Sequence, residues 1–166
     1  MAIIYIGIGS NEGDRLAILK DALLQLKRNL GIFMESSSLY ETEPWGFESS
    51  QTFYNCVLKF ETEHGPQELL NILQYIEKQA GRTKNDTVNY QNRTLDLDLL
   101  YYDNQIIEDA NLTVPHPKIS ERNFVLMPLA EINGELIDPV HQKSIQDLLK
   151  ESNDTNSVNR IDHDFQ

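Results

Sequence analysis

Two aspartates separated by a single residue form the pattern of this sequence with the most specific chemistry. Asp96 and Asp98 lie in residues 93–100, whose sequence is Arg-Thr-Leu-Asp-Leu-Asp-Leu-Leu. Side chains alternate between the two faces of a strand, so we expect both carboxylates on one face and the intervening leucines in a core on the other. Neighbouring carboxylates repel each other unless a cation lies between them. Oxygen ligands alone favour a hard ion, Mg²⁺ or Mn²⁺.

Arg93 directly precedes this pair and adds a positive charge at the same place. A metal ion, carboxylates and an arginine are the groups that stabilise a phosphoryl group during its transfer. An alternative stays open, because charged residues on a strand can serve only to prevent pairing with other strands. The two aspartates therefore predict a metal and phosphoryl site that needs support from the rest of the chain.

The charge of the chain limits its partners. The formal net charge of the 166 residues is -12 at pH 7, which argues against a nucleic-acid partner, because such binding depends on cations that contact phosphates. A polyphosphate would also be repelled unless positive charge is concentrated locally. Residues 82–93 contain Arg82, Lys84 and Arg93 but only one acidic residue, Asp86. This segment suits the focused binding of an anion.

Length and composition predict one domain over residues 1–150, followed by a loosely held polar tail over residues 151–166. There is no apolar run long enough to span a membrane, and the N-terminal residues lack the pattern of a secretory signal. Cys56 is the single cysteine, which excludes an internal disulfide. We expect a cytoplasmic protein that is a monomer or a weak dimer.

Periodic patterns predict the elements that position these residues. We expect strands over residues 2–9, 32–43 and 53–63, a fourth strand with the two aspartates, one helix between Asp14 and Gly31, and another between Gly65 and Gly81. Residues 120–132 are expected to be helical but broken at Pro128, and residues 144–150 to form a short helix. This order predicts an α+β ferredoxin-like (βαββαβ) sandwich, an antiparallel sheet with helices packed on it and a C-terminal extension.

Two loops leave alternatives open. The glycine-rich residues 7–14 suit a tight turn, although a turn between a strand and a helix can also bind phosphate. Trp45 and Phe47 lie in the loop between the second and third predicted strands, where they contact either a ligand or the core.

Five motifs occur in a specific order: Tyr-Ile-Gly-Ile-Gly-Ser-Asn at 5–11, Tyr-Glu-Thr-Glu-Pro-Trp-Gly at 40–46, Phe-Tyr-Asn at 53–55, Arg-Thr-Leu-Asp-Leu-Asp at 93–98, and Leu-Thr-Val-Pro-His-Pro at 112–117 with Arg-Asn-Phe at 122–124. Together they resemble the 6-hydroxymethyl-7,8-dihydropterin pyrophosphokinase family. The resemblance implies transfer of pyrophosphate from MgATP to the hydroxymethyl group of the pterin in folate biosynthesis, with release of AMP.

The resemblance also implies roles for individual residues. Asp96 and Asp98 would be catalytic and bind two Mg²⁺ ions with ATP, and Arg82 and Arg93 would neutralise the transferring group. The implied ATP-binding residues are Gln74, Glu77, Lys84, Leu99, Thr113, His116 and Arg122. The implied pterin-binding residues are Thr42, Pro44, Trp45, Phe53, Asn55 and Phe124. A flat pterin can stack between two of these rings, those of residues 53 and 124, while the amide of residue 55 offers a donor and an acceptor to its edge.

The sequence departs from the family in one segment. Lys84 replaces a common arginine, and Tyr90 is the nearest candidate for a family tryptophan; lysine gives a point charge where arginine gives a bidentate fork. This departure leaves open a nucleotide-binding relative without activity. Two further alternatives are a different metal-dependent nucleotidyl or glycosyl transferase, which would explain the two aspartates, and a nucleic-acid-binding module of the same fold, which the net charge disfavours.

Overall fold

The computed structural model describes residues 1–44, 50–81, 94–161 and 165. The predicted site residues Trp45, Arg82, Lys84 and Arg93 lie outside the described residues, as does Tyr90. The elements in chain order are β1 (Ala2–Ser10), α1 (Arg15–Asn29), β2 (Ile32–Ser36), β3 (Leu39–Thr42), β4 (Phe53–Thr62), α2 (Pro66–Gln79), β5 (Asp96–Tyr102), β6 (Ile107–Glu108), β7 (Thr113–Val114), the 3-10 turn η2 (Ile119–Glu121), α3 (Asn123–Asn133), β8 (Ile137–Asp138), β9 (Lys143–Ser144), α4 (Ile145–Glu151) and β10 (Val158–Ile161).

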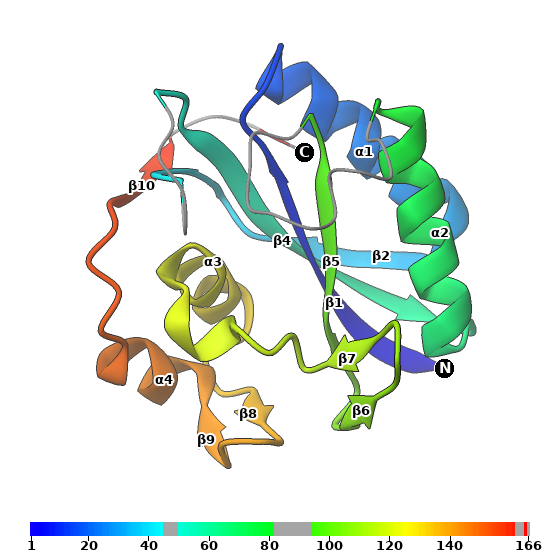
Figure 1. Cartoon of the computed structure of the whole chain (residues 1–166). Helices are drawn as coiled ribbons and strands as arrows, with labels where there is room; N and C mark the ends of the chain where they lie inside the picture. Colours follow the sequence, from blue (N-terminus) through cyan, green and yellow to red (C-terminus); the bar gives the residue numbers. More distant parts are fainter. Residues whose placement is uncertain (45–49, 82–93, 162–164, 166) are drawn as a thin grey trace.

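One twisted sheet forms the centre of the described chain (Figure 1). Its strands follow the order β10-β3-β4-β1-β5, and β2 pairs with a further part of β4. All of these pairs are antiparallel. The α+β class and the antiparallel sheet with packed helices are therefore confirmed.

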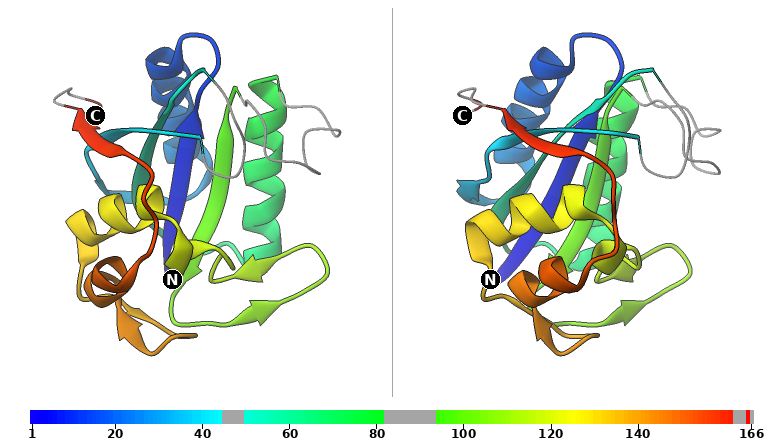
Figure 2. Two further views of the ribbon diagram at one scale, coloured as in Figure 1. Left: turned by 60° about the vertical axis from the view of Figure 1, so that its left-hand side comes forward. Right: turned by 90° about the vertical axis from the view of Figure 1, so that its left-hand side faces the viewer.

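Helices cover both faces of the sheet. Helices α1 and α2 lie on one face and α3 and α4 on the other (Figures 1 and 2). Alternation along β1 explains the two cores, because Ile4, Ile6 and Ile8 belong to the core under α1 and α2, whereas Tyr5 belongs to the core under α3 and α4. The described helices include none that is long and apolar enough to cross a membrane.

The first helix begins and ends where the sequence predicts. The Asp14 side chain accepts a hydrogen bond of 3.1 Å from the backbone N–H of Ala17, and this cap fixes the start of α1. Gly31 follows the helix with φ of 128°. A side chain at that position would also overlap the carbonyl oxygen of Glu61, so only glycine fits there.

Two predicted elements differ in the structure. The strand predicted over residues 32–43 is divided into β2 and β3, because Ser36 and Ser37 bond to neighbouring backbone groups between them. The helix break predicted at Pro128 is wrong, since α3 continues through it. Pro128 and its neighbour Leu129 are buried, and this packing offsets the hydrogen bond that a proline cannot donate.

The expectation of a loosely held C-terminal tail is also wrong. Residues Val158–Ile161 form β10, which pairs with β3 at the edge of the sheet. Phe165 is 4% exposed and lies in the core under α1 and α2. The polar composition after Glu151 did not predict this strand. An edge strand is held by backbone pairing, which needs no apolar side chains.

Candidate active site

Four predicted site residues line one small recess on the α3 face of the sheet. Strands β1, β4 and β5 form its floor, and the start of α3 forms one wall. We call it the carboxylate recess; its lining residues are Gly7, Ile8, Gly9, Asn55, Cys56, Val57, Asp96, Asp98, Leu100, Phe124 and Val125. The fold thus brings the two predicted metal ligands next to two predicted pterin-binding residues.

The two aspartates lie on the same face of β5. Asp98 is opposite Gly7 and Asp96 is opposite Gly9 in the antiparallel pair with β1. Both aspartates are half-buried, whereas the leucines at 95, 97 and 99 lie in the core beneath α1 and α2. The predicted division of faces is confirmed. With glycine at both opposing positions, β1 places no side chain directly beside the carboxylates.

The glycines of β1 correct the prediction of a tight turn. Gly7 and Gly9 lie within the strand, and of the three glycines in residues 7–14 only Gly13 has a positive φ, at 72°. A Cβ atom on Gly9 would overlap Oδ1 of Asn55, whereas one on Gly7 would lie 3.4 Å from the Leu100 side chain. Gly9 therefore allows Asn55 to approach β1. Glycines two residues apart in a strand could have indicated this close approach.

A buried hydrogen bond joins two predicted pterin-binding residues. Nδ2 of Asn55 donates to Oγ1 of Thr42 over 2.7 Å, and Asn55 is 8% and Thr42 2% exposed. This bond fixes the plane of the amide beside the carboxylate recess. Phe53 lies opposite Thr42 in the neighbouring strand and is half-buried, as is Pro44; neither lines the recess.

Glu77 has a structural contact that the sequence did not predict. Its carboxylate accepts a hydrogen bond of 2.8 Å from the backbone N–H of Leu97, and the side chain is 5% exposed. β5 is the last strand in the order of the described sheet, so this N–H faces α2 rather than another strand. Glu77 thus ties the helix to the residue between the two aspartates.

His116 is held as a neutral ring. The pKa of His116 is lowered from the ordinary 6.5 to about 4, chiefly by burial and then by the positive charge of Arg122, while the negative charge of Asp96 opposes the shift. Nδ1 accepts a hydrogen bond of 3.2 Å from the backbone N–H of Lys118. The proton of the neutral ring is therefore on Nε2, which makes that nitrogen a hydrogen-bond donor.

Arg122 brings a buried positive charge to the edge of the carboxylate recess. The residue is 6% exposed, and its guanidinium carbon lies 5.6 Å from the centre of the Phe124 ring. That distance suits a cation–π interaction. The remaining predicted ATP-binding residues are more scattered: Thr113 and Gln74 are exposed, and the Leu99 side chain is in the core, which leaves only its backbone for a ligand.

No group of three or more histidine, cysteine, aspartate or glutamate residues within the described part of the chain is arranged to hold a metal ion. Mg²⁺ does not require such a group of protein ligands. This ion keeps several waters and is commonly bound by one or two carboxylates together with substrate phosphates. The donors of Asp96 and Asp98 therefore match a metal that arrives with a nucleotide.

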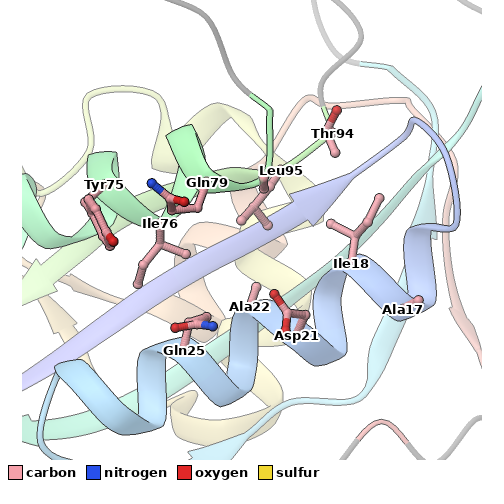
Figure 3. Close-up of a pocket in the computed structure, with 11 residues that line it drawn as sticks. Ala17, Ile18, Asp21, Ala22, Gln25, Tyr75, Ile76, Gln79, Thr94 and Leu95 are labelled. Atoms are coloured by element: carbon pink, nitrogen blue, oxygen red, sulfur yellow. The ribbon is translucent and has the colours of Figure 1, made fainter.

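A larger cavity lies on the other face, between α1 and α2, and has a volume of about 440 Å³ (Figure 3). Ile76 and Leu95 contribute apolar surface to it, and Asp21 is its charged lining residue. Among the predicted site residues that the structure describes, none lines this cavity. Asp96, Asp98, Asn55 and Phe124 line the smaller carboxylate recess on the opposite face.

Comparisons with known proteins agree with the resemblance. The family model described as 7,8-dihydro-6-hydroxymethylpterin-pyrophosphokinase matches residues 5–134. The chain is 42% identical to the 2-amino-4-hydroxy-6-hydroxymethyldihydropteridine pyrophosphokinase of Porphyromonas gingivalis, over 80% of this chain and 91% of that protein. It is 38% identical to the protein of the same name from Aquifex aeolicus, over 92% of this chain and 93% of that protein.

Longer proteins also contain a similar part. The folic acid synthesis protein fol1 of Pneumocystis carinii is 40% identical over 86% of this chain, which spans only 19% of that protein. A solved structure of Plasmodium falciparum HPPK-DHPS with pteroate superposes with a TM-score of 0.75, covering 90% of this chain and 44% of that one, at 15% identity. At that identity the likeness shows a shared fold.

Proposed function

The chain belongs to the 7,8-dihydro-6-hydroxymethylpterin-pyrophosphokinase family, and we propose that the carboxylate recess is where it transfers pyrophosphate. The reaction moves pyrophosphate from ATP to the hydroxymethyl group of 6-hydroxymethyl-7,8-dihydropterin in folate biosynthesis and releases AMP. Family membership favours this reaction over a sugar-nucleotide transferase or a nucleic-acid-binding module. The observation that carries the location is that Asp96, Asp98, Asn55 and Phe124 line one recess.

On the nucleotide side, we propose that Asp96 and Asp98 bind two Mg²⁺ ions together with the triphosphate of ATP. When bound, the metal ions neutralise the phosphate charge that would otherwise be repelled by a chain with net charge -12. The two carboxylates are half-exposed and share a face of β5, so they can orient the metals toward the recess without further protein ligands.

His116 and Arg122 would act on the same phosphates. A neutral His116 donates from Nε2 without adding charge, and Arg122 adds a fixed positive charge that cannot be lost at physiological pH. The predicted contributions of Arg82, Lys84 and Arg93 stay proposals, as do those of Thr113, Gln74 and the backbone of Leu99. For Glu77 we propose a positioning role through Leu97 in place of direct nucleotide contact, because of the hydrogen bond described above.

On the pterin side, Asn55 would recognise the polar edge of the substrate and Phe124 would stack on its ring. Thr42 holds the Asn55 amide in place. Because the amide is already ordered in the folded chain, substrate binding does not carry the entropic cost of ordering it. Phe53, Pro44 and Trp45 would complete the pocket. Little proton chemistry is required, because positioning and charge neutralisation dominate phosphoryl transfer.

The arrangement of the core further supports a ferredoxin-like topology, which we propose for β1, α1, the β2–β3 pair, β4, α2 and β5. The order β3-β4-β1-β5 and the antiparallel pairing support it. β10 is then an addition at the β3 edge. We also propose that the chain acts as a monomer or a weak dimer.

The experiment that tests the function measures AMP formed from ATP and Mg²⁺ with and without added 6-hydroxymethyl-7,8-dihydropterin. AMP that appears only when the pterin is present is the expected result. ATP binding without pterin-dependent AMP would instead identify a nucleotide-binding relative without activity. A parallel reaction with Mg²⁺ removed by a chelator should form no AMP.

A further inference from the structure

The C-terminal segment from Asp154 to Ile161 contacts the start of α3 and strand β3, the elements next to the proposed pterin-binding residues. It lies beyond the residues 5–134 that match the family model. Figure 2 shows it running from α4, past the start of α3, to the edge of the sheet at β3. We propose that this segment, through Asp154 and β10, positions the proposed pterin-binding residues Phe124, Thr42 and Asn55. The proposal rests on the function and site proposed above.

The first attachment is at the start of α3. Oδ2 of Asp154 accepts a hydrogen bond of 2.9 Å from the backbone N–H of Asn123, and the carbonyl oxygen of Asp154 accepts one of 3.1 Å from Asn123 Nδ2. Asn123 is the first residue of α3, where backbone N–H groups have no partner within the helix. Because Phe124 follows directly, this contact sets the position of the ring that lines the recess.

The second attachment is at the end of β3. Val158 pairs with Thr42 in the antiparallel β10–β3 ladder. The neighbouring residues add two bonds, from the backbone N–H of Glu43 to the carbonyl oxygen of Ser157 over 3.2 Å, and from the backbone N–H of Ser157 to Oε2 of Glu43 over 3.1 Å. Thr42 in turn holds Asn55, so β10 supports the proposed edge-recognition group.

A single carboxylate connects the two attachments. Oδ1 of Asp154 accepts a hydrogen bond of 3.0 Å from the backbone N–H of Asn156, while its Oδ2 binds α3. The side chain thus fixes the turn into β10 and the start of α3 at once. A separate tie between α3 and β3 runs through Glu131, which accepts bonds from Ser38 and Tyr40. Without the Asp154 side chain, α3 and β3 are therefore still joined through Glu131. The start of α3 is then no longer held in a fixed position relative to the end of β3.

The effect of Asp154 is expected to fall on one substrate. β10 and β5 lie at opposite ends of the strand order, and the proposed metal ligands are on β5. The groups that Asp154 and β10 hold, Phe124 and the Thr42–Asn55 pair, belong to the proposed pterin side. Disturbing the segment should therefore weaken pterin binding and leave nucleotide binding largely unchanged.

The test compares Asp154→Ala with Asp147→Ala, which replaces an exposed aspartate of α4. Dissociation constants for the pterin, with a non-hydrolysable ATP analogue and Mg²⁺ present, and for the analogue alone are measured by calorimetry. We expect Asp154→Ala to weaken pterin binding about fivefold to tenfold, because the start of α3 must then be ordered when the pterin binds, with the analogue constant unchanged. Asp147→Ala should match the original chain in both.

Asp154→Asn gives a second arm, because it keeps one of the two acceptor oxygens and removes the negative charge at the helix start. It should bind the pterin with an affinity between those of the original chain and Asp154→Ala. Unchanged pterin binding in both variants, or equal weakening of both ligands, would overturn the proposed positioning role. An original chain that binds no pterin would contradict the proposed function itself, so the two failures are distinguishable.

Discussion

The Glu77 carboxylate, on α2, accepts a 2.8 Å hydrogen bond from the backbone N–H of Leu97, the residue between the two aspartates of β5. Replacing Glu77 by alanine leaves this N–H without that acceptor, and a buried unsatisfied group costs about 1–3 kcal/mol. We expect Glu77→Ala to lower the free energy of unfolding by that amount and to reduce turnover, because the edge strand that carries the aspartates loosens.

Glu77→Gln keeps an oxygen acceptor and should restore most of the stability. Lys78→Ala changes an exposed position of the same helix and should alter neither quantity. Urea unfolding and pterin-dependent AMP formation give the two measurements. If Glu77→Ala were as stable as Lys78→Ala, the hydrogen bond would contribute nothing and the positioning role would be lost.

Gly9 offers a steric test of the recess. A Cβ atom at Gly9 overlaps Oδ1 of Asn55, whereas one at Gly7 is 3.4 Å from the flexible end of Leu100. Gly9→Ala should therefore displace the Asn55 amide and weaken pterin binding strongly, and Gly7→Ala should have a much smaller effect. The double variant Gly9→Ala with Asn55→Ala removes the overlap, so it should regain stability but not pterin affinity. Calorimetric titration and thermal unfolding separate these outcomes; full pterin affinity in Gly9→Ala would contradict the assigned role of Asn55.

The sequence predicted the features that follow from alternation and capping. The two faces of β5 and the Asp14 cap depend on residues close together in the chain, where strand geometry and helix-end chemistry act directly. The α+β class followed from the order of such local patterns. The resemblance then supplied roles for residues such as Asn55 and Phe124, whose own surroundings in the sequence suit ordinary strand and core positions.

The features that the sequence did not predict are contacts between distant segments. Glu77 resembles any helical glutamate until Leu97 is placed opposite it, and Asp154 lies in a polar stretch typical of a disordered tail. Pro128 was expected to end a helix because its cost is local, while the burial that offsets this cost depends on the whole second core. Long-range pairing of this kind leaves no periodic signal.

The aspartate pair gives a direct test of the proposed metal site. Asp98→Asn removes one charge from the carboxylate recess and should reduce turnover by at least about a hundredfold, as expected when a charge-stabilising group is lost. Because a repulsive pair is relieved, the free energy of unfolding should not fall. Asp109→Asn, at an exposed site, serves as the control. Rates of AMP formation across a Mg²⁺ titration measure the effect, and near-original rates in Asp98→Asn would remove Asp98 from the proposed chemistry.

His116 predicts how stability depends on pH. Its pKa is about 4 in the folded chain, against an ordinary 6.5, chiefly because of burial. Between these values the unfolded chain binds a proton at His116 and the folded chain does not. The contribution of the ring to stability is therefore fully present above about pH 6.5 and is lost as the pH falls toward 4, with a slope of at most about 1.4 kcal/mol per pH unit.

His116→Gln removes this titration, so its free energy of unfolding should fall less steeply than that of the original chain between pH 6.5 and 4. Other acidic groups titrate in both proteins, and the difference between the two curves isolates His116. Urea unfolding at half-unit pH intervals makes the measurement. Parallel curves for His116→Gln and the original chain would mean that the ring is not held neutral, and its proposed role as an uncharged donor to phosphate would have to be abandoned.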